Sequence, residues 1–152
     1  MSSVDAQTPA DSLPAYQRIP GVPPFKVMLA PDSVAFTKEE LKKKKATIIM
    51  VFSPDCDHCI HSTEDMLANY RRIKKAQVIM ATSLAYQHIQ KFYNDLNIAK
   101  YPSVKVGLDN TFFLGTFYEV HSYPAIFVYD KHGKFKQYFD GSAKWEEIAK
   151  AL

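Results

Sequence analysis

The feature that most constrains the fold is a continuous, mostly apolar run at residues 47–52, typical of a strand buried on both faces of a sheet. A break at residues 53–55 follows, and apolar side chains then recur at helical spacing as far as Ile73. Residues 77–81 form a second short apolar run, and residues 83–96 repeat the helical pattern. This β-α-β-α order predicts two parallel strands joined by a right-handed crossover.

The last third of the chain changes character. Residues 125–129 and 134–139 have strand patterns, and the polar turn between them ends in glycine, so they predict an antiparallel hairpin. Residues 145–152 carry the apolar stripe of a final helix, and the segment from about 100 to 119 is either an insertion or a strand plus a short helix. We therefore expect an α/β fold with a mixed central sheet, helices on both faces, and a C-terminal hairpin plus helix.

The N-terminal residues 1–31 hold six of the nine prolines, which favours an extended arm over a helix or a central strand. We expect this Pro-rich arm to precede a single domain at residues 32–152. No apolar stretch is long enough to cross a bilayer, and no charged segment followed by an apolar one indicates a signal peptide. The lysine run at 42–45 is typical of a solvated face and does not by itself indicate nucleic-acid binding.

The only two cysteines, Cys56 and Cys59, stand at the start of the first predicted helix. Two cysteines exclude a scaffold with several disulfides and a four-cysteine zinc site. The free N–H groups and the positive dipole end of a helix N-terminus stabilise a thiolate there. Cys56 is therefore the candidate nucleophile. Cys59, one turn further along the same face, is the candidate resolving thiol that attacks a mixed disulfide.

The charged residues around the two thiols have opposite effects on the stability of the thiolate. His58 favours the thiolate and a more oxidising pair, whereas Asp55 and Asp57 disfavour the thiolate. A C-x-x-C motif between a buried strand and a helix indicates a redox-active pair rather than a structural one. We expect no metal or organic cofactor for this chemistry.

The motif has two other interpretations. A metal-binding module is the main alternative, because the two thiolates with His58, His61 or His121 offer soft sulfur and imidazole ligands for copper or zinc. A thiol peroxidase is disfavoured, since no threonine precedes Cys56 at the spacing of peroxiredoxins and no arginine lies close by.

The strand, the C-x-x-C motif and the later Ser-Tyr-Pro-Ala at residues 122–125 together resemble the thioredoxin-like superfamily over about residues 33–152. Residues 51–56 most resemble its redoxin branch, which includes the TlpA- and ResA-type proteins. The resemblance implies that Pro124 is the cis-proline that faces the active-site sulfurs and presents substrate, with Tyr123 before it facing the substrate. It also implies exchange with protein thiols and disulfides, a redox partner protein, and a periplasmic or cell-envelope location, the cytoplasm being the alternative.

The chain departs from the thioredoxin pattern at three places. Asp55 replaces the tryptophan before the first cysteine, and Asp57-His58 replaces Gly-Pro between the cysteines. Met50 stands where thioredoxins carry a buried carboxylate that moves the proton of the resolving thiol, and a methionine cannot take up a proton. Either Asp55, Asp57 or water does so, or Cys59 is activated more slowly, which argues against a general thioredoxin-like reductase activity.

Six aromatic residues near the predicted proline loop have two interpretations. At this density they are typical of a core, but an exposed part would line a groove for an extended polypeptide or a specific partner. They are Phe112, Phe113, Phe117, Tyr118, Tyr123 and Phe127.

Overall fold

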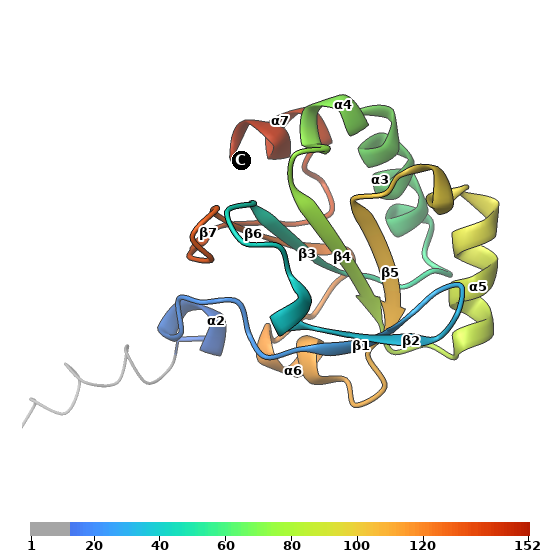
Figure 1. Ribbon diagram of the computed structural model, residues 1–152, viewed down its shortest axis with the longest axis horizontal. Helices are drawn as coiled ribbons and strands as arrows, with labels where there is room; N and C mark the ends of the chain where they lie inside the picture. Colours follow the sequence, from blue (N-terminus) through green and yellow to red (C-terminus); the bar gives the residue numbers. More distant parts are fainter. Residues whose placement is uncertain (1–12) are drawn as a thin grey trace, which may run out of the picture.

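The computed structural model describes residues 13–152 and contains one seven-stranded mixed sheet with the strand order β2-β1-β5-β4-β3-β6-β7 (Figure 1). The strands are β1 (Lys26–Leu29), β2 (Val34–Thr37), β3 (Thr47–Val51), β4 (Gln77–Thr82), β5 (Val104–Leu108), β6 (Ala125–Tyr129) and β7 (Phe135–Phe139). The α-helices are α2 (Ala15–Arg18), α3 (Asp57–Ala68), α4 (Tyr70–Ile73), α5 (Tyr86–Asp95), α6 (Phe113–Phe117) and α7 (Trp145–Lys150). The described residues also form two 3₁₀ helices, η2 (Lys38–Glu40) and η3 (Ile98–Lys100).

Strand β3 lies in the middle of the sheet, parallel to β4 and antiparallel to β6. All five of its residues are buried, as its continuous apolar sequence predicts. Because side chains alternate across a sheet, Ile48 and Met50 face one layer of helices whereas Ile49 and Val51 face the other. The strand that leads to Cys56 is therefore held from both sides.

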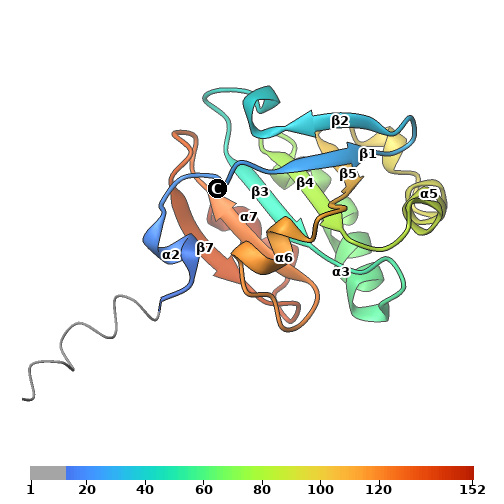
Figure 2. The same cartoon turned by 90° about the horizontal axis from the view of Figure 1, so that it is seen from below.

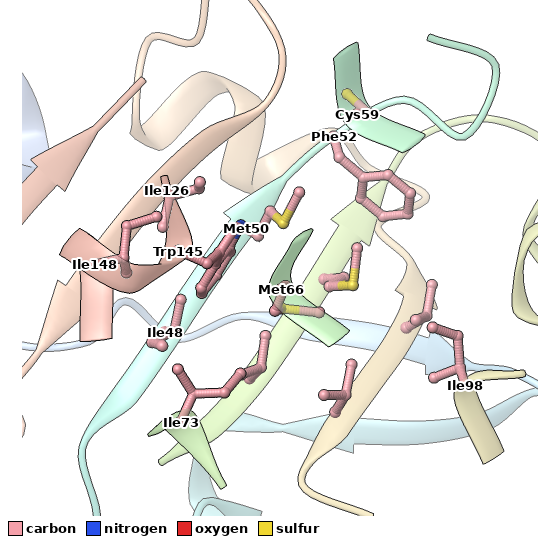
Figure 3. Close-up of a cluster of buried hydrophobic side chains, with 14 of the residues drawn as sticks. Ile48, Met50, Phe52, Cys59, Met66, Ile73, Ile98, Ile126, Trp145 and Ile148 are labelled. Atoms are coloured by element: carbon pink, nitrogen blue, oxygen red, sulfur yellow. The ribbon is translucent and has the colours of Figure 1, made fainter. Parts of the chain in front are cut away.

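The two faces of the sheet carry separate apolar cores. Helices α3, α4, α5 and α7 cover one face, and its core includes Met66, Trp145 and Ile148 (Figure 3). Helices α2 and α6 cover the other face, where Tyr16 and Leu114 are buried. No helix among residues 13–152 is long and apolar enough to span a membrane.

The predicted fold class is confirmed. The crossover units, the C-terminal hairpin β6–β7 and the final helix all occur, and the segment 100–119 is a strand plus a short helix, β5 and α6, rather than an insertion. Strand β5 extends the parallel part of the sheet next to β4.

The N-terminal part differs from the expected extended arm. Residues 15–18 form a helix, and β1 lies inside the sheet between β2 and β5, so the domain does not begin at residue 32. The reason is that Pro24 and Pro31 flank the strand instead of interrupting it, and flanking prolines leave the ladder N–H groups of β1 intact. Residues 1–12 of the expected arm lie outside the described residues.

Candidate functional site

Cys56 lies where the chain leaves the sheet and enters helix α3. It is the N-cap residue of α3, with an extended backbone at φ −96° and ψ 126°. Its N–H donates to the Ser53 carbonyl at 3.2 Å, and its own carbonyl accepts the N–H of Ile60 at 3.0 Å. The Cys56 side chain is partly exposed, whereas Cys59 is fully buried. A partner can therefore reach Cys56 directly but not Cys59.

The Cys59 thiol belongs to the core beneath helix α3, where Phe52 and Met50 are also buried (Figure 3). The pKa of this thiol is raised to about 12, chiefly by burial; the Ser53 N–H lowers it, and the neighbouring Cys56 adds a smaller increase. That N–H donates to the Cys59 sulfur at 3.4 Å. In the dithiol form Cys59 is thus a neutral thiol at neutral pH.

The C-terminal helix fixes the helix that carries both thiols. The Trp145 indole N–H donates to the Ser62 hydroxyl at 3.0 Å, and the Trp145 backbone N–H donates to a carboxylate oxygen of Asp65 at 2.9 Å. Within α3 itself, the Thr63 hydroxyl donates to the Cys59 carbonyl at 2.7 Å. The position of Cys59 therefore depends on α7, more than 80 residues away along the chain.

The register between β3 and β6 brings the proline loop to the cysteine loop. Val51 pairs with Ala125, so Pro124 lies at the same end of the sheet from which residues 52–56 leave. The Tyr123–Pro124 peptide bond is cis, as is Ala30–Pro31. Tyr123 is partly buried and packs against both cores.

Gly141 lies against Pro124 and leaves no room for a side chain. A Cβ atom at position 141 would lie 2.6 Å from Pro124 Cδ, whereas one at Gly21 would meet nothing nearer than 4.0 Å. We expect Gly141→Ala to destabilise the fold by about 1–3 kcal/mol through overpacking against the proline loop. Guanidinium unfolding of this variant beside Gly21→Ala measures the cost, and equal midpoints for the two would contradict the expected contact.

The charged neighbours of the motif, Asp55, Asp57 and His58, are all exposed. His88 of α5 joins them in the structure: its Nδ1 lies 3.4 Å from an Asp55 carboxylate oxygen. Nothing in the sequence around His88 indicates this contact. A hollow of about 300 Å³ opens beside this pair. Its walls are Pro54, Asp55, Ile60, His88, Lys91, Phe92, Asp95 and Leu96. The side of the cysteine loop next to α5 thus carries both charge signs.

The aromatic residues near the proline loop belong mostly to the core. Tyr118 and Phe127 are buried and stack with ring centroids 3.7 Å apart, and the Tyr118 hydroxyl lies 2.7 Å from that of Tyr129. Phe113 is partly buried. Phe112 differs, since it is 41% exposed. The buried rings, such as Tyr118 and Phe127, are thus core residues, whereas Phe112 is exposed to solvent.

The metal alternative finds no support in the arrangement of these side chains. Within residues 13–152, which include both cysteines and all five histidines, no group of three or more His, Cys, Asp or Glu side chains is placed to hold a metal ion. His58, His61 and His121 are all exposed and complete no such set with the two thiols.

No family model and no curated protein sequence matches the chain. Several solved structures do match the chain. A secreted disulfide oxidoreductase of Mycobacterium tuberculosis, homologous to E. coli DsbE, is 14% identical with a TM-score of 0.69, over 84% of this chain and 92% of that one. The exposed lipoprotein thioredoxin Etrx1 of Streptococcus pneumoniae is 22% identical with a TM-score of 0.62, over 86% and 100%. A peroxiredoxin-like protein of Aquifex aeolicus is 16% identical with a TM-score of 0.69, over 86% and 82%. The chain has the thioredoxin-like fold that its sequence predicts.

Proposed function

We propose that this protein is a thiol–disulfide oxidoreductase that works through Cys56 and Cys59. The observation that carries the proposal is the pairing of an accessible thiol at the start of α3 with a buried thiol one turn further on. The pairing of Val51 with Ala125 supports the proposal, since the Tyr123–Pro124 loop then lies at the end of the sheet from which the cysteine loop leaves.

The chemistry needs no group beyond the two thiols. The Cys56 thiolate attacks a substrate disulfide, forms a mixed disulfide and releases one substrate thiol. Cys59 then loses its proton and attacks the Cys56 sulfur, which releases the second substrate thiol and leaves a Cys56–Cys59 disulfide. The substrate gains two electrons and two protons, and the protein loses them. The reverse sequence oxidises a substrate dithiol.

Protein thiols or disulfides are the proposed substrates, with a second redox protein resetting the pair. In this scheme Pro124 and Tyr123 contact the bound polypeptide, and Asp55, Asp57 and His58 adjust the reduction potential. The segment 51–56 favours the redoxin branch with the TlpA- and ResA-type proteins. Two structural neighbours are a secreted protein and an exposed lipoprotein, which supports a location in the cell envelope.

A redox titration tests the proposal. The protein is equilibrated against glutathione and dithiothreitol buffers, and its free thiols are then alkylated and counted by mass measurement. We expect one reversible two-electron couple. A potential near or below about −250 mV assigns the protein as a reductant, whereas one of about −120 to −180 mV assigns it as an oxidant or isomerase. Alkylation of the unfolded protein checks that both thiols are intact. If they are and no reversible couple is found, the proposed function is overturned.

A further inference from the structure

A broad basic groove lies at the end of the sheet where β3 begins. We call it the lysine groove, and its volume is about 800 Å³. The charged residues that line it are Lys38, Glu39, the run Lys42–Lys45 and Lys131. Six lysines against one glutamate give it a formal charge of +5, whereas the whole chain carries only +3. The positive charge of the molecule is therefore concentrated at this place, and the remainder of the chain is net acidic.

The backbone at the first residue of the lysine run, Lys42, is held in place by a buried glutamine. The side chain of Gln77, which is only 8% exposed, accepts the Lys42 N–H at 2.8 Å and donates to the Lys42 carbonyl at 2.9 Å. It also donates to the Thr47 hydroxyl at 3.1 Å. Among residues 13–152 the ion pairs are His88–Asp55 and Lys91–Asp95, so no carboxylate of the described chain neutralises a lysine of the groove. The six lysines of the groove are thus without an ion-pair partner among residues 13–152.

An exposed apolar residue precedes, in the chain, the first residue that lines the lysine groove. Ile19 is 49% exposed and stands two residues before Gly21, which lines the groove. The Phe135 N–H donates to the Pro20 carbonyl at 2.7 Å, and Gly21 bridges to Lys134, so this segment is fastened to the β6–β7 hairpin. Helix α2, the hairpin turn and the connection from β2 to β3 lie along the same edge of the molecule (Figure 2).

We propose that the lysine groove binds the anionic surface of a lipid bilayer, with Ile19 entering the interface. Lysine clusters and a neighbouring exposed apolar side chain act together at such surfaces, the first by attraction to anionic headgroups and the second by apolar burial. A soluble polyanion would use the lysines but give Ile19 no part in binding. A bilayer uses both features.

This mode of binding leaves the two thiols free. Thr47, in the groove, begins β3, and Cys56 follows the opposite end of that strand. At about 3.3 Å per residue, the strand and the loop after it separate the groove from Cys56 by more than roughly 15 Å. A protein seated on a membrane through the groove therefore presents Cys56 on the side away from the lipid.

Vesicle sedimentation tests the proposal with the full-length protein. Binding is expected to vesicles with about 30 mol % phosphatidylglycerol in phosphatidylcholine, to be absent from pure phosphatidylcholine, and to weaken strongly at about 0.5 M salt. Each lysine near the surface contributes about fivefold to partitioning, so Lys42→Gln with Lys43→Gln should lower it roughly 30-fold. Ile19→Ser should weaken it as well, at unchanged net charge.

The matched control replaces two lysines outside the groove, Lys91→Gln with Lys144→Gln, and changes the net charge equally. This variant should keep most of the wild-type partitioning. Equal loss in both double variants, or no binding to anionic vesicles, would overturn the proposal. Binding to heparin that is as tight as to vesicles and insensitive to Ile19→Ser would assign the groove to soluble polyanions instead, and would likewise overturn it.

Discussion

Replacing Cys56 with serine is expected to lower the rate of disulfide exchange by at least about a thousandfold, because a hydroxyl does not replace the attacking thiolate. Cys59→Ala should behave differently. It leaves Cys56 accessible at the start of α3, so the first step proceeds and the second has no nucleophile. A mixed disulfide between Cys56 and the substrate should therefore accumulate to about one equivalent per protein.

Non-reducing electrophoresis and intact-mass measurement with a disulfide-containing peptide distinguish the two variants. The expected pattern is a stable adduct with Cys59→Ala and none with Cys56→Ser. The opposite pattern would show that Cys59 is the nucleophile and Cys56 the resolving thiol. The burial of Cys59 argues against that assignment. Full exchange activity in both variants would show that the pair does not carry the reaction.

The parts of this site that follow from sequence are local ones. The buried strand β3, the break after it and the helix that begins at Cys56 are adjacent in the chain, and their patterns depend only on neighbouring residues. The resemblance to a known fold led us to expect Pro124 near the thiols, but not the pairing of β6 with β3 that places it there. That pairing does not follow from the composition of either strand.

The parts that sequence did not predict are contacts between distant segments. His88 meets Asp55 because α5 packs beside the cysteine loop, and nothing in the local pattern around His88 marks that contact. The prolines near the N-terminus indicated an arm, but the docking of Tyr16 onto the rings of Tyr118 and Phe127 holds helix α2 against the sheet. Tertiary packing therefore outweighed proline content there.

The lysines at 42–45 show the same limit. A run of lysines predicts a solvated face, and these side chains do lie at the surface. Their meeting with Lys131 in one groove depends on the β6–β7 turn, about 85 residues later in the chain. The sequence pattern gives the charge but not its concentration in space.

The second large expected effect concerns pH. Cys59 must lose its proton before it attacks the Cys56 sulfur, and burial raises the pKa of Cys59 to about 12. Below that pKa the thiolate fraction increases tenfold for each pH unit. The rate of the second thiol release should therefore rise steeply, by up to about a hundredfold, between pH 7 and pH 9.

The sign of this dependence follows from the causes of the shift. Burial is the largest of them, and it opposes the charged thiolate whether or not Cys56 carries a substrate. The contribution from Cys56 itself disappears once that sulfur is bonded in a mixed disulfide, and the Ser53 N–H continues to favour the thiolate. The pKa of Cys59 in the mixed disulfide thus stays above its ordinary value, although below that in the dithiol form.

Single-turnover kinetics with a peptide disulfide that releases two distinguishable thiols separates the two steps. Met50 is fully buried in the core that contains Cys59, and it offers no proton acceptor. Asp55 and Asp57 are exposed on the cysteine loop and at the start of α3. If solvent takes the proton, Asp55→Asn and Asp57→Asn leave the tenfold rise per pH unit unchanged. A plateau below about pH 8 in the wild type that either substitution removes would identify that carboxylate as the base instead.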